Sequence, residues 1–144
     1  MVTAARIAET LGGPRVLKRK SPTLEELHAQ LRSGLPYSAL EAVASGFDIG
    51  KEELIAVLHL PARTLARRKR EKRLRADESD RLFRLGRIAA LAQEVLASRE
   101  KATRWLHQPN RALGNAAPLR QLDTDLGARQ VEDLLLRIAH GVYS

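Results

Sequence analysis

The sequence predicts an all-α protein in which an N-terminal helix-turn-helix bundle is joined by a long central helix to a small C-terminal helical domain. Hydrophobic residues make up 44% of the 144 residues but aromatic residues only 3%, a mixture that favours closely packed helices over a sheet sandwich. Apolar residues recur at spacings of three and four along most of the chain, which is the helical period. Glycine and proline interrupt these runs at places that suit helix ends.

The positive charge is concentrated in one segment. The formal net charge is +8, from 25 Lys and Arg against 17 Asp and Glu. Residues 63–75 hold eight of these basic residues and a single acidic one, so this segment alone contributes +7. A local cationic surface of this kind indicates a polyanionic partner such as nucleic acid.

Composition excludes several classes of protein. The chain has no cysteine, which rules out disulfides, thiolate nucleophiles and cysteine-based metal sites. No apolar run approaches the roughly 20 residues that span a bilayer, and the N-terminus lacks the apolar core of a signal peptide. We therefore expect a cytoplasmic protein with no membrane partner.

Residues 1–20 are expected to form a flexible lead or an edge segment. The Gly12-Gly13 pair is not followed by a Lys-Ser/Thr pair, so it does not indicate a phosphate-binding loop. The segment ends in a cluster of three basic residues, Lys18, Arg19 and Lys20.

The helix-turn-helix bundle is predicted over residues 21–75. Thr23 and Glu26 form a capping box, behind which Leu24 and Leu27 share one face of a short helix. A second short helix follows, begun by a proline and ended by a glycine. These two helices would form the base of the bundle.

Residues 48–70 have the pattern of a helix, a three-residue turn and a second helix. Leu54, Ile55 and Leu58 would bury the first helix, and Leu65, together with Ala62, would anchor the second helix against it. A helix-turn-helix needs this spacing, because a few inward apolar residues hold the second helix while its outward face stays free. The turn holds His59 where many such motifs place a glycine.

The outward face of the second helix is the candidate nucleic-acid interface. Guanidinium groups suit guanine edges and phosphate oxygens. A face this cationic would repel itself unless phosphates neutralise it, although a solvated charged helix is the alternative. The residues expected to contact DNA are Arg63, Thr64, Arg67, Arg68 and Arg70.

A long central helix is predicted over residues 76–97. Asp77, Glu78 and Asp80 lie at its N-terminal end, where the helix dipole favours acidic residues, so these carboxylates need no catalytic explanation. Its apolar residues cover more than one face, as is typical of a helix buried at the centre of a bundle. If it also packs against a second copy, the homodimer would present two recognition helices to a two-fold DNA site.

Residues 98–144 are predicted to form a compact helix-loop-helix domain. Ser98 caps a helix that contains Trp105 and ends at Pro109. After an irregular but partly apolar stretch, Thr124 caps a last amphipathic helix.

The sequence gives no indication of catalysis. The histidines lie in separate elements without the spacing of metal ligands, and no nucleophile-base pair is visible. We therefore expect a protein that is not an enzyme, with no catalytic residue, no metal and no cofactor. The histidines are His28, His59, His107 and His140.

Several short motifs are specific when taken together. They are Arg63-Thr64-Leu65 with Arg67-Arg68, Asp77-Glu78-Ser79-Asp80-Arg81-Leu82, Ala102, Trp105-Leu106, Pro109-Asn110, Leu113-Gly114, Pro118-Leu119, Leu122, Thr124, Gly127, Val131-Glu132, Leu135, Ile138 and Gly141-Val142. With these motifs the chain, from the Leu11-Gly12-Gly13 stretch onward, resembles the Xre/MbcA/ParS family of antitoxins from type II toxin-antitoxin systems.

The resemblance implies a cognate toxin, commonly of the RES type that degrades NAD, or a related ADP-ribosylating enzyme. The antitoxin would inhibit this toxin by covering its active-site cleft, and residues 98–144 would be the toxin-binding domain. The resemblance also implies a dimer that binds operator DNA and represses the shared operon.

Polar groups of the C-terminal domain are the candidate toxin contacts, because apolar residues at helical spacing usually pack inward. An arginine among them would suit a pocket built for the phosphates of NAD. The residues expected to contact the toxin are Lys101, Arg104, Asn110, Arg111, Asn115 and Arg129.

Two other functions remain open on the sequence. A free-standing helix-turn-helix regulator would use the C-terminal domain only for dimerisation. A protein-interaction module would bind another protein, and its arginines would be solvated surface residues that contact no nucleic acid.

Overall fold

The computed structural model describes residues 2–141, and within them the regular structure is helical, with no strand. The elements in chain order are α1 (Ala4–Thr10), α2 (Pro14–Leu17), α3 (Leu24–Ser33), α4 (Tyr37–Gly46), α5 (Lys51–Leu58), α6 (Ala62–Glu71), α7 (Ala76–Leu96), α8 (Arg99–His107), the 3-10 helices η1 (Arg111–Leu113) and η2 (Pro118–Asp123), and α9 (Asp125–Ala139). The predicted all-α class is confirmed. None of these helices is long and apolar enough to cross a bilayer. Val142, part of the last motif quoted above, lies outside the described residues.

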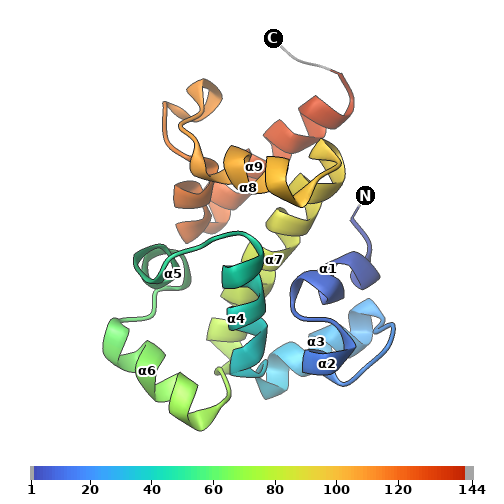
Figure 1. The fold of residues 1–144 in the computed structure, drawn as a ribbon, viewed down its shortest axis with the longest axis vertical. Coiled ribbons are helices and arrows are strands. Elements are labelled where there is room, and N and C mark those ends of the chain that lie inside the picture. The colour runs from blue at the N-terminus through green and yellow to red at the C-terminus, as the bar shows by residue number, and fades with distance from the viewer. Residues whose placement is uncertain (1, 142–144) are drawn as a thin grey trace.

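Helix α7 is the axis of the fold (Figure 1). It packs against α1, α3, α5, α8 and α9, and ten of its 21 residues are buried, so its predicted central position is confirmed. The burial leaves no exposed large apolar side chain on α7. Phe83, Val95 and Leu96 of α7 are only partly buried, and the expected pairing of two chains through this helix stays a prediction.

The N-terminal segment contains two short helices within residues 2–20, so the expected flexible lead is wrong there and the alternative of an edge segment is the one that remains. The segment forms α1 and α2, and the side chains of Ile7 in α1, Leu11 at the C-cap of α1 and Leu17 in α2 are almost fully buried. Leu11 lies over Gly86 of α7, where a Cβ would stand 3.1 Å from Leu11 Cδ2. A run this short gives too little helical periodicity to be recognised in the sequence, and the glycine at position 86 is the partner that makes room for it.

Helices α3 and α4 form the base of the N-terminal half. The predicted capping box is confirmed, because the Glu26 N–H donates to Thr23 Oγ1 (3.1 Å) and the Thr23 N–H donates to Glu26 Oε1 (3.0 Å). Leu27 is buried, but Leu24, expected on the same buried face, is 62% exposed. Leu24 opens α3 at the edge of the bundle, where no other element covers it.

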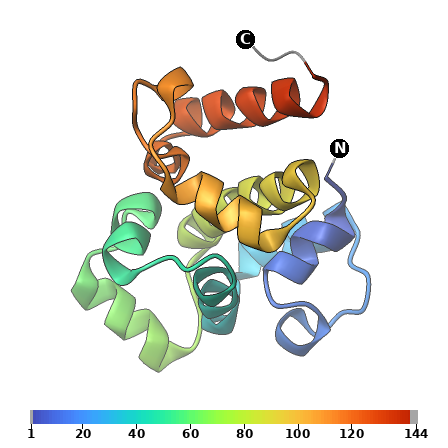
Figure 2. The ribbon, with the colours of Figure 1, turned by 45° about the horizontal axis from the view of Figure 1, so that its top comes forward.

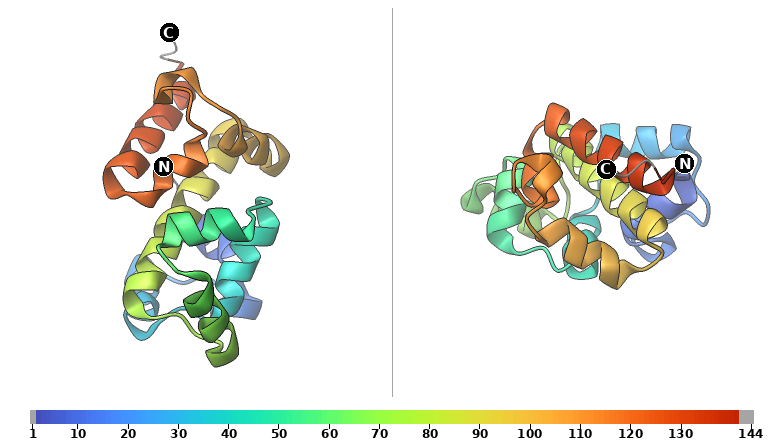
Figure 3. Two further views of the ribbon diagram at one scale, coloured as in Figure 1. Left: turned by 90° about the vertical axis from the view of Figure 1, so that its left-hand side faces the viewer. Right: turned by 90° about the horizontal axis from the view of Figure 1, so that it is seen from above.

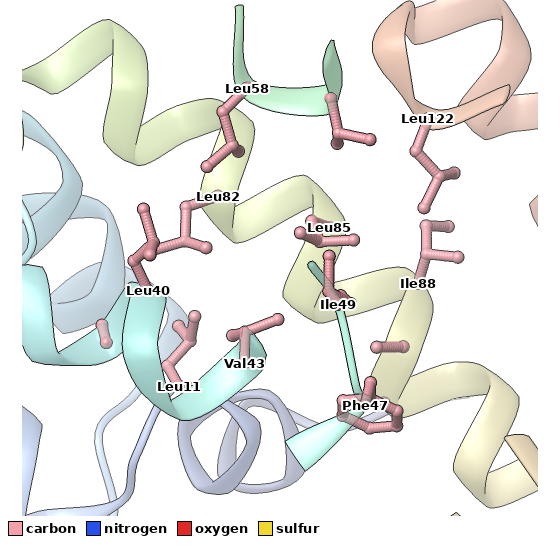
Figure 4. Packing of buried hydrophobic residues seen from close by; sticks show 14 of the residues in the cluster. Leu11, Leu40, Val43, Phe47, Ile49, Leu58, Leu82, Leu85, Ile88 and Leu122 are labelled. Carbon is pink, nitrogen blue, oxygen red and sulfur yellow. The ribbon is translucent and has the colours of Figure 1, made fainter. Parts of the chain in front are cut away.

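Leucine and isoleucine side chains attach both halves of the chain to α7. Leu40 of α4 points towards Leu82 of α7, and Leu122 of η2 lies beside Ile88 (Figure 4). The two predicted domains therefore share a single hydrophobic core, with no separate core in each.

The C-terminal half is stacked on the helix-turn-helix half along the long axis of the molecule (Figure 3, left). Helix α9 lies on the outside of this half, beyond α7 and α8 (Figure 2). Element η2 packs against both α9 and α5, which closes the junction. Arg84 Nη2 of α7 donates to the carbonyl of Leu122 in η2 (3.2 Å), and Arg81 Nη1 of α7 donates to that of Leu58 in α5 (3.3 Å), so α7 holds both sides of this junction.

If the first helix belongs to the core, Leu11→Ala should lower the free energy of unfolding by about 2–5 kcal/mol, the usual cost of a large cavity. Urea denaturation followed by circular dichroism measures this loss. Leu24→Ala is the matched control and should cost less than about 0.5 kcal/mol, since that side chain is exposed. Equal effects of the two substitutions would contradict the packing described for α1.

Candidate functional site

The helix-turn-helix consists of α5, a turn and α6. His59 ends α5 in the left-handed conformation (φ 55°), the conformation that glycine adopts most easily. Its ring Nε2 donates to the carbonyl of Asp123 in η2, and Leu60 in the turn is buried. The histidine thus provides the turn geometry without a glycine, and it also connects the turn to the C-terminal half.

Helix α6 presents its arginines in two opposite directions. Leu65 and Arg68 are buried, whereas Arg63, Arg67 and Arg70 are exposed. The three exposed arginines follow one another at intervals of four and three residues and therefore share one face. Thr64, also expected to contact DNA, is only partly exposed.

Arg68 does not belong to the exposed face, so the expectation that it contacts DNA is not supported by its position. It is 3% exposed, its Nε donates to Glu78 Oε1 (2.7 Å), and its Nη1 donates to Glu71 Oε1 (3.2 Å). A run of basic residues from 67 to 70 covers almost the whole circumference of a helix, so one of them must face inward. The sequence did not reveal that its partner would come from the first turn of α7.

Glu78 is the acidic partner of this buried pair. Its Oε1 also accepts the Arg75 N–H (2.8 Å), which caps α7. Burial opposes the charged form of Glu78, but the hydrogen bonds from Arg68 and Arg75 and the charge of Arg68 outweigh it, so the pKa of Glu78 lies below its ordinary value. The hydrogen bond to Glu78 raises the pKa of Arg68, so both groups are charged.

The chain that follows α6 is fixed by backbone hydrogen bonds. The Tyr37 N–H donates to the carbonyl of Lys72 (3.0 Å), and the Leu74 N–H donates to that of Leu35 (2.9 Å). The Ser79 hydroxyl accepts the Leu35 N–H (2.7 Å) inside the core. Together with the Arg68–Glu78 pair, these bonds set the orientation of α6 relative to α7.

The loop between α8 and α9 is a closed turn. The Asn110 N–H donates to the carbonyl of Ala116 (3.0 Å), and Asn110 Oδ1 accepts the Ala112 N–H (3.0 Å). Thr124 caps α9 as predicted, accepting the Gly127 N–H (3.0 Å). A Cβ at Gly127 would stand 1.9 Å from the carbonyl of Gln121, so only glycine fits there.

The six predicted toxin contacts do not form one cluster. Arg111 and Asn115 are exposed in the loop, while Asn110 is partly buried and occupied in capping η1. Lys101 and Arg104 are exposed on α8, and Arg104 pairs with Glu100 at 3.2 Å. Arg129 is exposed on α9 and pairs with Asp125 at 2.9 Å.

A hollow of about 410 Å³ lies between the loop and α9. On the α9 side it is lined by Asp133 and Arg137, which were not among the predicted toxin contacts. Leu126, in the first turn of the same helix and 69% exposed, is a further residue that was not predicted as a contact. Leu126 lies outside the buried stripe of α9 that contains Val131 and Leu135. A large apolar residue outside that stripe is the feature of the sequence that indicates a contact residue here.

Two of the four histidines, His59 and His107, make hydrogen bonds to backbone carbonyls, and His28 and His140 are exposed. His107 Nε2 donates to the carbonyl of Phe47 (2.9 Å), and its Nδ1 lies 3.3 Å from Glu53. Within residues 2–141, no three His, Asp or Glu side chains gather in a way that would hold a metal ion.

Comparison with known proteins assigns both halves of the chain. Residues 26–87 match the family model described as the antitoxin Xre-like helix-turn-helix domain, and residues 91–141 match the antitoxin Xre/MbcA/ParS C-terminal toxin-binding domain. The boundary between the two matches falls within α7.

Three proteins named Antitoxin Xre are similar to this chain. The protein from Photorhabdus laumondii is 33% identical over 120 residues, which are 82% of this chain and 81% of that protein. The protein from Yersinia enterocolitica is 30% identical over 116 residues, 79% and 78% of the two chains. The protein from Pseudomonas putida is 45% identical over 83 residues, 57% of this chain, and the chain spans about half (52%) of that relative's length.

Replacing the buried arginine, Arg68→Gln, should lower the free energy of unfolding by about 3–5 kcal/mol, because the carboxylate of Glu78 is left buried without its partner. Urea denaturation at neutral pH measures the loss. Arg67→Gln removes the same charge from the exposed face of α6 and should change stability by less than about 0.5 kcal/mol. A loss below about 1 kcal/mol in Arg68→Gln would show that the pair does not hold α6 in place.

The same pair gives a second readout in the pH dependence of stability. The pKa of Glu78 is lower in the folded state than its ordinary value of 4.5, so its contribution is present above about pH 4.5 and is lost as the pH falls through the folded-state pKa. The wild type should therefore lose stability in acid more steeply than Glu78→Gln, which has no carboxyl to protonate. If the free energy of unfolding of the two proteins falls equally steeply as the pH is lowered, the result would contradict this assignment.

Proposed function

This chain belongs to the Xre family of antitoxins, and from that premise we propose that it acts at two surfaces. The C-terminal domain binds a cognate RES-type toxin, an enzyme that degrades NAD or ADP-ribosylates its target, and covers the active-site cleft. The exposed face of α6 binds operator DNA, as a homodimer, and represses the operon that encodes both proteins.

The single observation that carries the DNA half of the proposal is the division of arginines on α6. Arg63, Arg67 and Arg70 share the exposed face, while Arg68 is neutralised internally by Glu78. A helix held at a fixed angle with three guanidinium groups outward suits a major groove, where arginine pairs with guanine edges and phosphates.

The toxin half of the proposal is supported by the surface around the closed loop. Arg111 and Asn115 project from the loop, and the hollow beside it is lined by Asp133 and Arg137. Leu126 adds a large exposed apolar side chain, the type of residue that anchors protein interfaces when it enters a pocket. Arg111 is exposed on this surface, and its guanidinium group would suit a site for the phosphates of NAD.

The alternative function is a free-standing regulator whose C-terminal half serves only for dimerisation. Both functions require DNA binding by α6, so they differ in what the C-terminal half binds: a toxin in the first, a second copy of this chain in the other. Co-expression of this chain with the product of the neighbouring gene provides the test. The antitoxin proposal expects that product to arrest growth alone and to co-purify with this chain, and a harmless product that does not co-purify would overturn it.

Replacing two exposed arginines, Arg67→Gln with Arg70→Gln, should weaken binding to a promoter duplex and reduce the slope of log affinity against log salt by about two, one for each lost phosphate contact. Fluorescence anisotropy at several salt concentrations measures both effects. Arg68 is left intact because it is buried. Toxin neutralisation should be unchanged, and its loss along with DNA binding would contradict the assignment of separate surfaces.

Replacing the exposed leucine of α9, Leu126→Ser, should weaken binding of the purified toxin by about tenfold or more, because an apolar anchor is removed from the interface. Isothermal titration calorimetry measures the change. Leu24→Ser removes the other large exposed apolar side chain of the described structure, on the helix-turn-helix half, and should leave toxin affinity unaltered. Equal toxin affinities for the two variants would show that Leu126 is not in the interface.

A further inference from the structure

A cationic hollow lies in the N-terminal half, outside the α6 face. It has a volume of about 390 Å³ and lies between α2, the end of α3 and the chain that follows α6. Three of its lining residues are basic and none is acidic: Lys18, Arg19 and Arg73. We call it the flanking hollow.

Arg73 is held at the edge of the flanking hollow by the backbone. Its Nη1 donates to the carbonyls of Gly34 (2.7 Å) and Ser33 (3.4 Å), which fixes the planar group while the residue stays exposed. Within residues 2–141, neither Arg73 nor Lys18 forms an ion pair with a carboxylate. Arg19 is the exception among the lining cations, since it pairs with Glu26 at 2.6 Å. Two cations of the hollow thus remain without an internal counter-charge.

Two lysines occupy helix ends where the backbone favours glycine. Lys18 ends α2 with φ 62°, and Lys72 ends α6 with φ 63°, both in the left-handed conformation. A residue with a Cβ is strained there, and a lysine one position earlier would satisfy the helix dipole without that strain. The conformation alone does not mark a functional position, because other residues with a side chain also have a positive φ: Asp48, His59, Ala97 and Asn115. What Lys18 and Lys72 share is that each places a cation at the end of a helix.

The flanking hollow lies beyond the C-terminal end of α6, because Arg73 lines it two residues after Glu71, the last residue of that helix. After α6 the chain continues through Lys72 to Arg73. The backbones of Arg73 and Pro36 form an isolated antiparallel bridge, and both residues line the hollow. In Figure 1, α6 and α2 lie at the same end of the molecule, whereas α8 and α9 lie at the other end. A duplex that contacts the C-terminal end of α6 therefore runs close to these cations.

We propose that the flanking hollow binds a backbone phosphate of the same DNA duplex that α6 contacts, through Lys18 and Arg73. The contact is independent of sequence, because phosphates carry no base information, and it fixes the register of the protein on the duplex. The inference rests on the proposed DNA binding. It assigns a DNA-contacting role to the N-terminal segment, which the charge of α6 alone does not suggest.

The test uses the full chain and a labelled duplex of about 40 base pairs from the promoter upstream of its own reading frame, long enough for several helical turns. Lys18→Gly places the residue that the backbone favours, so its thermal midpoint should equal or exceed that of the wild type. Its DNA affinity should nevertheless fall, by about fivefold at 0.1 M salt, and its salt slope should fall by about one. Arg73→Gln should show the same loss of affinity and slope.

Arg6→Gln is the matched control, because Arg6 is an exposed cation on α1 that borders a different hollow, beside α7 and Arg99. It should bind DNA as the wild type does. The inference is overturned if Lys18→Gly binds with the affinity and salt slope of Arg6→Gln while the wild type still binds DNA. If the wild type shows no salt-dependent binding to the duplex, the proposed DNA function fails instead. Should Arg73→Gln unfold, the result for Lys18→Gly decides.

Discussion

The side chains of α7 are buried against both halves of the chain, and this packing determines where the other elements lie. Leu82 and Leu85 hold the helix-turn-helix half, and Ile88 meets Leu122 of the C-terminal half. Because one core serves both halves, removing either half exposes apolar surface of the other. Point substitutions on the surface should therefore separate the two proposed activities more cleanly than truncations do.

The buried pair of Arg68 and Glu78 extends this constraint to the surface. It connects the centre of α6 to the first turn of α7, so the direction of the exposed arginines is set by the core. Breaking such a pair costs far more than an exposed ion pair contributes, because an uncompensated charge stays buried. One arginine of the basic run thus positions the helix, while Arg63, Arg67 and Arg70 remain free to bind.

Much of the fold was predictable from the sequence because local signals agree with tertiary packing. The capping box at Thr23, the acidic start of α7 and the Thr124 cap are each decided within one turn of helix. Other features depend on distant partners. The end of the first helix packs where Gly86 leaves room for Leu11, and the inward direction of Arg68 depends on Glu78. On the toxin side, the spread of the six candidates over α8, the loop and α9 follows from chain packing, which no local pattern encodes.

The two proposed surfaces lie at opposite ends of the long axis, with α6 at one end and the α8–α9 loop at the other (Figure 3, left). DNA and toxin should therefore bind at the same time. Size-exclusion chromatography with light scattering, on the purified antitoxin mixed with toxin and a promoter duplex, tests this directly. The account predicts one species whose mass contains all three components. Displacement of the DNA by the toxin, or elution of the toxin on its own, would contradict it.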